Sequence, residues 1–268
     1  MLNAIVIVWR ESLEAMLVVG VLLAWIARQP EPAGLRRSLW GGIAAGILLA
    51  AALGGATFAA QSSFAGDALE RFQLALLFFA AGLILQMVLW MHRHGRHMRR
   101  QLESQAADAG GRLGLALIAA LAVAREGAET VVFLYGLGLE GGDGLPALAA
   151  AALAGLLLAA ATSWLVARGA RFLKLATLFR VSEILLLFIA NAMLASGIDR
   201  LVGLDWLPPL LDPVWDSSFL LADGQGAGRL LADFAGYRAR PSGMLLAACA
   251  AFWCLALWRL RALDRKPA

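Results

Sequence analysis

The chain alternates between long apolar runs and short polar segments. A helix needs about 20 apolar residues to cross a bilayer, and seven runs reach or approach that length. We therefore predict membrane-spanning helices at about residues 4–27, 38–60, 71–91, 113–138, 146–167, 181–198 and 242–259. The one long segment between them, residues 199–241, is expected to fold back on the membrane surface, with a short helix at 228–237, because its polar residues are interspersed with tryptophan, proline and phenylalanine.

The composition supports a membrane protein. Of the 268 residues, 61% are hydrophobic, and the mean hydropathy is +0.74, which lies outside the range of soluble domains. The fold class we predict is an all-α integral membrane protein with a single transmembrane domain over residues 1–268. The net charge of +4 does not call for a nucleic-acid partner, because the basic residues fall where membrane topology places them.

Loop charges predict the orientation. Sixteen of the 23 Lys and Arg residues fall in the segments that share one side of the membrane with the C-terminus, at 28–37, 93–112, 168–180 and 259–266. Cytoplasmic loops are enriched in Lys and Arg. The N-terminus is therefore predicted outside and the C-terminus in the cytoplasm, as in a multi-pass protein of a cell membrane. The external segments are rich in Asp and Glu, which would attract a cation.

Two apolar runs contain the same charged pattern, Arg-Glu-x-x-Glu. It occurs in the first and fourth predicted helices, as Arg10, Glu11 and Glu14 and as Arg125, Glu126 and Glu129. One charge at mid-membrane depth costs about 2.5–3.5 kcal/mol on insertion scales, so six such residues indicate a function. On a helix the three positions lie at about 0°, 100° and 40°, and therefore share one face.

The duplicated pattern indicates an inverted repeat. The first and fourth helices run in opposite directions in the predicted topology, and residues 76–81 resemble residues 186–191, which aligns Gln73 with Glu183. We predict one repeat at about 1–92 and a second at about 112–200, followed by the external loop at about 199–241 and a seventh helix at about 242–259. Transporters built this way often bind their substrate between the two halves.

The residue types indicate which ligand the two motifs bind. Together they offer four carboxylates and two guanidinium groups, and oxygen ligands suit hard cations, whereas zinc and copper sites usually include His or Cys. Ferric iron fits this site, but the ligand type leaves Mn²⁺, Mg²⁺ and Ca²⁺ open. A structural alternative is that each motif is an ion pair that only fixes helix register; the excess of carboxylates disfavours it.

These features resemble the oxidase-dependent high-affinity iron permease family of bacteria and fungi. The family's hallmark is Arg-Glu-x-x-Glu in the first and fourth of seven helices, commonly with Gly after the first Glu; this chain has Gly127 in one copy and Ser12 in the other. The external segment is similar to bacterial members at residues 214–218, 228–231, 236–237 and 241–242.

The resemblance implies import of iron across a plasma or bacterial inner membrane, as Fe³⁺ delivered by a partner oxidase or iron-delivery protein outside the cytoplasm. It implies that Glu11, Glu14, Glu126 and Glu129 are the iron ligands and that Arg10 and Arg125 support them. Iron is then a transported substrate, no cofactor is permanently bound, and the chain is not an enzyme. The alternatives are a transporter of another hard cation by proton exchange and a non-transporting membrane sensor or assembly subunit.

Other polar residues are secondary candidates. Glu183 is either an exit ligand or a partner of Arg180, which lies one turn earlier. Asn191 offers either a carbonyl ligand or a hydrogen bond between helices, and Gln73 is a candidate through its alignment with Glu183. A run of three histidines, His92, His94 and His97, is either a receiving site for the ion or a solvated loop among arginines.

Overall fold

The structure is a computed structural model that describes residues 2–94, 98–109, 111–141, 145–168 and 175–265. Its regular elements are α-helices, and no strand occurs in these ranges. The helices are α1 (Leu2–Ile26), α2 (Pro32–Ser63), α3 (Asp67–His94), α4 (Met98–Asp108), α5 (Arg112–Gly141), α6 (Leu145–Ala167), α7 (Leu175–Gly203), α8 (Gly226–Ala235) and α9 (Gly243–Asp264). Several residues of the predictions above lie outside the described ranges, namely Arg96, His97, Arg171, Lys174 and Lys266.

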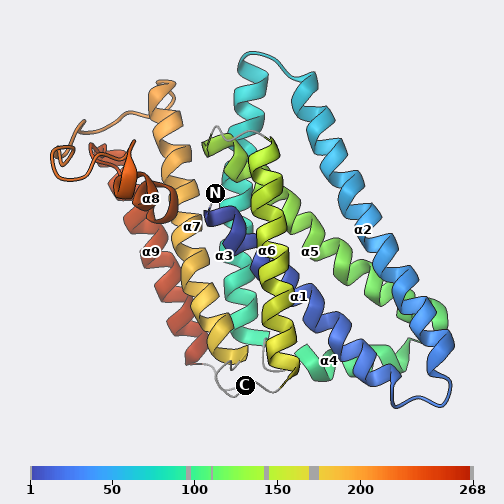
Figure 1. Ribbon diagram of the computed structural model, residues 1–268. Helices are drawn as coiled ribbons and strands as arrows, with labels where there is room; N and C mark the ends of the chain where they lie inside the picture. Colours follow the sequence, from blue (N-terminus) through green and yellow to red (C-terminus); the bar gives the residue numbers. More distant parts are fainter. Residues whose placement is uncertain (1, 95–97, 110, 142–144, 169–174, 266–268) are drawn as a thin grey trace.

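The long helices pack side by side as one bundle. Figure 1 shows α3, α6, α7 and α9 standing next to one another, while α1 and α5 run obliquely and α2 packs along α5. A cluster of buried apolar side chains joins α1, α3, α5, α7 and α9, with Leu77, Phe133 and Ile189 fully buried in it. α4 crosses the end of the bundle at which α9 ends, and the connection from α2 to α3 lies at the opposite end.

The outer surface of the bundle is apolar. Large side chains such as Leu48, Leu121, Leu157 and Trp258 are more than half exposed on four different helices. Contiguous apolar surface of this extent marks contact with lipid or another apolar phase. Five helices, α2, α3, α6, α7 and α9, are long and apolar enough to cross a membrane. The protein is therefore an integral membrane protein.

The two remaining long helices carry the charged motifs. α1 has 25 residues and α5 has 30, so both are long enough to span a bilayer. Each has three charged residues near its middle, which sets it apart from the five apolar helices. The seven predicted apolar runs thus all fall on helices, and the two with interrupted apolar character are the ones that bring charge into the bundle.

The sequence prediction missed one helix and misplaced the ends of others. α4 occupies residues that we expected to be a connecting loop, and it is amphipathic, with Ala106 buried and Leu102 packed against the α1–α5 region. The predicted short external helix is present but begins and ends two residues earlier, at Gly226–Ala235. α7 continues to Gly203, which shortens the external segment.

Glycines permit the close contact between α2 and α5. A Cβ atom at Gly42 would collide with the backbone oxygen of Ala116, and one at Gly46 would lie 2.7 Å from the backbone oxygen of Ala120. The Gly-x-x-x-Gly spacing of these two residues on α2 thus serves close helix packing. α6 meets α1 in a similar way, because a Cβ at Gly155 would lie 2.8 Å from the oxygen of Ile5.

This contact gives a first prediction. Gly42→Ala is expected to destabilise the protein by roughly 1–3 kcal/mol, since overpacking against a backbone atom forces the two helices apart. Gly41→Ala is the matched control, because a Cβ there meets nothing within 4 Å and alanine favours the helix. Thermal unfolding of the purified protein in detergent compares the two. Equal midpoints for both variants would contradict the role of Gly42.

Candidate metal centre

The two charged motifs face each other across the contact between α1 and α5. Glu11, Glu126 and Glu129 each place one carboxylate oxygen so that all three oxygens lie within 4.8 Å of one another. Glu11 and Glu126 are buried and Glu129 is partly buried. Two oxygens on opposite sides of one ion, each about 2.0–2.4 Å from it, are separated by up to about 4.8 Å. The spacing therefore suits three ligands of a single cation.

These carboxylates keep free acceptor capacity. One oxygen of each, Oε2 of Glu11, Glu126 and Glu129, is buried and has no hydrogen-bond partner among the described residues. Buried acceptors are normally paired, and an ionised carboxylate has acceptors but no donor. A bound cation would satisfy these oxygens, so the donor set fits a metal ion.

Arg10 is the fully buried counterpart of this acidic group. Its guanidinium lies 3.0 Å from Oε1 of Glu11 and 2.6 Å from Oε1 of Glu14, and Nη1 also donates to Sδ of Met87 at 2.7 Å. The 2.6 Å contact is an ion pair without the alignment of a hydrogen bond. Glu14 is therefore held by Arg10 and lies outside the three-carboxylate group, a separation that helical angles alone do not predict.

Arg125 repeats the pairing in a more open setting. Its Nε lies 2.9 Å from Oε1 of Glu129, the same i, i+4 pair that Arg10 makes with Glu14. Its side chain is 46% exposed, however, and stacks over the ring of Trp90 at 4.9 Å. The two motifs thus have the same internal pairing but differ in how far the rest of the protein covers them.

The glycine in the second motif has a packing reason. A Cβ at Gly127 would lie 2.5 Å from the Cβ of Ala50 on α2. A side chain at this position would push α2 away from the helix that carries Glu126 and Glu129. The equivalent residue on α1 is Ser12, which is partly exposed and tolerates a side chain.

The sequence matches the model of the iron permease FTR1 family over residues 1–258. The chain belongs to the iron permease family. Among curated relatives, the ferrous iron permease EfeU of Escherichia coli O6:H1 is 30% identical over 247 residues, covering 88% of this chain and 86% of the relative. The iron permease EfeU of Bacillus subtilis is 32% identical over 225 residues, covering 77% of this chain but only 45% of its own length.

A similar protein also occurs in Archaeoglobus fulgidus. An uncharacterized protein of Archaeoglobus fulgidus is 32% identical over 202 residues, covering 75% of this chain and 70% of its own. No solved structure matches the chain. Membership of the iron permease family makes this chain a multi-pass membrane protein of iron transport, and a transporter rather than an enzyme.

The secondary candidates of this iron permease lie apart from the three-carboxylate group. Glu183 on α7 is paired with His92 on α3, with 3.5 Å between Oε2 and Nδ1, rather than with Arg180. His92 also contacts Asp264 at the end of α9, with 2.8 Å between Nε2 and Oδ1. No pattern in the sequence indicated Asp264, because 172 residues separate it from His92. His97 and the side chain of His94 lie outside the described residues.

The other two candidates are at or near the external segment. Asn191 is buried on α7 and donates from Nδ2 to the backbone oxygen of Ala235 at 2.9 Å, which fastens α8 to the bundle. Its Oδ1 has no hydrogen-bond partner. Gln73 lies in the second turn of α3, half-buried, and no described contact joins it to the motif carboxylates. Both residues stay predictions as ligands.

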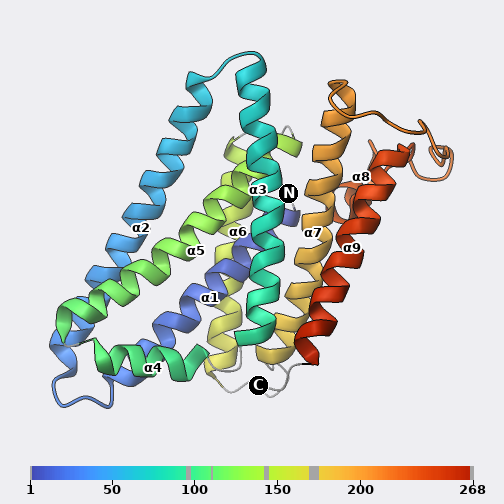
Figure 2. The same ribbon diagram turned by 180° about the vertical axis from the view of Figure 1, so that it is seen from behind.

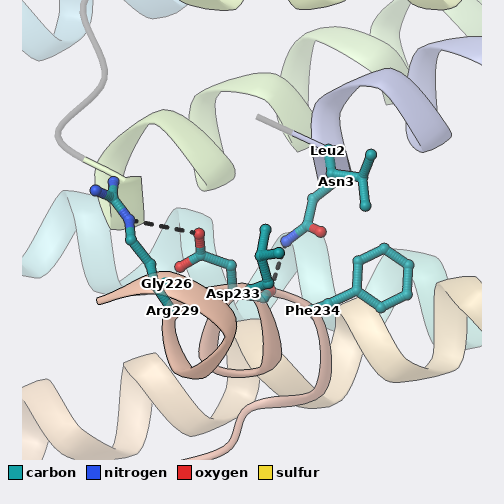
Figure 3. Close-up of a pocket in the computed structure, with 7 residues that line it drawn as sticks. Leu2, Asn3, Gly226, Arg229, Asp233 and Phe234 are labelled. Atoms are coloured by element: carbon teal, nitrogen blue, oxygen red, sulfur yellow. Dashed lines mark hydrogen bonds and ion pairs between the residues drawn. The ribbon is translucent and has the colours of Figure 1, made fainter. Parts of the chain in front are cut away.

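The external segment of the iron permease is held to the bundle by polar contacts. Asn3 at the start of α1 donates to the backbone oxygen of Asp233 on α8 at 2.5 Å, beside a cavity of about 290 Å³ that Arg229 and Phe234 also line (Figure 3). Farther out, hydrogen bonds from the Arg240 guanidinium and then from Ser218 hold the pKa of the Asp216 carboxyl well below its usual range. The segment is thus an ordered structure.

Proposed function

We propose that this iron permease imports iron across the bacterial inner membrane through the carboxylates of its two Arg-Glu-x-x-Glu motifs. The observation that carries the proposal is the group formed by Glu11, Glu126 and Glu129, which joins both motifs in one buried, oxygen-only site. Glu14 completes the proposed ligand set once the ion draws it from Arg10. Arg10 and Arg125 limit the net negative charge before the ion arrives.

The proposed architecture has seven membrane-spanning helices, α1, α2, α3, α5, α6, α7 and α9, with the N-terminus outside and the C-terminus in the cytoplasm. Residues 1–92 and 112–200 form two inverted repeats, with the external loop and α9 added. The contact pattern supports a two-fold relation: α2 packs on α5 as α6 packs on α1, while α1 meets α5 and α3 meets α7. Figure 2 shows α2 beside α5 from the opposite side of the bundle.

The ion is proposed to enter as Fe³⁺ after oxidation by an extracytoplasmic partner. Three or four carboxylates suit a small, highly charged ion, and the copper ligands that an oxidase needs are nearly absent from this chain. The E. coli relatives are named ferrous iron permeases. Entry as Fe³⁺ and the ferrous names of these relatives are compatible if iron is supplied as Fe²⁺ and is oxidised before it reaches the carboxylates. No permanently bound cofactor is proposed.

Radio-iron uptake tests this proposal. Cells that lack other iron importers, and that produce this chain together with a partner oxidase, are expected to accumulate iron at least tenfold faster than cells without the chain. Omitting the oxidase is expected to lower the rate when iron is given as Fe²⁺ and not when it is given as Fe³⁺. Accumulation of Mn²⁺ but not iron would favour the second candidate, a transporter of another hard cation, which the oxygen-only site also fits.

A further inference from the structure

We propose that Glu183 and His92 form a second cation site, at the cytoplasmic end of the bundle, which receives iron as it leaves the motif carboxylates. The inference rests on the proposed function and adds an exit ligand pair to it. Glu183 is on α7, His92 is at the end of α3 and Asp264 is at the end of α9. Three helices that are far apart in sequence thus bring one imidazole and two carboxylates together.

The distance between Glu183 and His92 suits shared coordination better than a hydrogen bond. Oε2 of Glu183 and Nδ1 of His92 lie 3.5 Å apart, beyond the usual range for a hydrogen bond, which ends near 3.2 Å. Bonds of about 2.1 Å from one ion to a nitrogen and an oxygen, at a tetrahedral angle, place these two atoms about 3.4 Å apart. The pair is therefore already spaced for a shared ion.

Asp264 is placed to orient the imidazole of His92. Nε2 lies 2.8 Å from Oδ1 of Asp264, a normal distance for an N–H donating to a carboxylate. A neutral imidazole that donates from Nε2 has a lone pair on Nδ1, which here points at the Glu183 carboxylate, itself an acceptor. Metal-binding histidines commonly donate their other N–H to a carboxylate in this way. Asp264 is accordingly a positioning residue.

The location connects this pair to the central site. The charge of Glu183 interacts with that of Glu14, and Glu14 is held by Arg10 beside Glu11. The side chains become more accessible along the series, from 2% exposed at Glu14 to 16% at Glu183, 29% at His92 and 68% at Asp264. An ion that passes from Glu14 to Glu183 therefore moves from a dry site toward water.

The ligand types differ from those of the central site. Carboxylates alone also accept Mg²⁺ and Ca²⁺, whereas an added imidazole favours first-row transition metals. The exit pair is thus selective for iron and similar metals over Mg²⁺ and Ca²⁺. The ligands of the exit pair are intermediate in type between the four motif carboxylates and the ligands that iron meets in the cytoplasm.

Iron titration of the purified full-length protein in detergent, combined with uptake in cells, tests the exit site. Wild type is expected to bind ⁵⁵Fe, supplied as ferric citrate, at two classes of sites. Binding at one class, the exit site, is expected to persist in excess Mg²⁺. Glu183→Gln and His92→Gln are expected to lose that class, to keep the other, and to take up iron at least tenfold more slowly. Asp264→Asn is expected to weaken the exit class about tenfold. Glu103→Gln, which removes the pair with Arg28, is expected to change neither binding nor uptake.

The retained class of sites shows that the variants fold. If Glu183→Gln and His92→Gln keep the wild-type stoichiometry and uptake, or slow uptake without loss of a class of sites, the exit site is wrong and His92 only bridges two carboxylates as an imidazolium. A wild-type chain that takes up no iron overturns the proposed function instead. In that case the same titration with Mn²⁺ tests the exit site independently of iron uptake, through the class of sites that Glu183→Gln and His92→Gln are expected to lose.

Discussion

Replacing Glu11 or Glu126 by Gln is expected to lower iron uptake at least about 100-fold, more than the 10–100-fold in affinity or activity that outer partners of a metal site typically contribute. The amide keeps the size of the side chain and removes the charge. Both residues belong to the buried three-carboxylate group, so each substitution takes away one ligand charge where water cannot replace it. Initial rates of radio-iron uptake, normalised to the amount of protein in the membrane, measure the effect.

Two comparisons make this prediction specific to the geometry. Glu70→Gln is the control, since Glu70 is exposed in the first turn of α3, and it is expected to stay within twofold of wild type. Glu14→Gln is expected to slow uptake less than Glu11→Gln because Glu14 lies outside the three-carboxylate group. A wild-type rate in Glu11→Gln or Glu126→Gln would refute the proposed ligand set.

Arg10→Gln is expected to destabilise the protein by about 3–5 kcal/mol, the usual result of breaking a buried ion pair by removing one partner. Arg10 has no exposed surface and is the close cation for both Glu11 and Glu14. Without it, two buried carboxylates lose their counter-charge. The loss is measured as a lower thermal midpoint of the purified protein in detergent.

The second motif supplies the matched control for Arg10. Arg125→Gln removes a guanidinium that makes the same i, i+4 pair but is 46% exposed, so fewer fully buried groups lose their counter-charge. Its midpoint is therefore expected to fall only slightly. Arg10→Lys keeps the charge but loses the planar set of N–H donors of the guanidinium. Its thermal midpoint is expected to lie between those of Arg10→Gln and Arg125→Gln. Equal destabilisation by Arg10→Gln and Arg125→Gln would show that burial does not separate the two arginines.

The sequence predicted the long helices well because length and apolar composition determine a membrane helix almost locally. α4 was not predicted because it contains no long apolar run. The signal was present in its helix-forming residues, Gln, Glu, Leu and Ala, and in the spacing of Leu102 and Ala106 on one face. A short amphipathic helix of this kind is stabilised by tertiary contacts, which the sequence does not display.

The site was predicted in its residues but not in its arrangement. Helical angles place Arg10, Glu11 and Glu14 on one face of one helix, yet they do not say how α1 and α5 cross. The crossing decides that Glu11 meets the second motif while Glu14 turns to Arg10. The contact of Asp264 with His92 depends on the packing of α9 against α3, which no local pattern encodes.

The packing of helices from one proposed repeat against helices of the other restricts how the permease can open. α2 packs on α5 and α6 packs on α1 through glycines that bring backbones into contact. Pulling residues 2–94 away from residues 112–203 as two blocks would break both of these interfaces at once. We expect the moving units to be the pairs α2–α5 and α1–α6 instead. Each pair then carries one motif, and their relative sliding assembles or separates the carboxylates without exposing either glycine-packed surface.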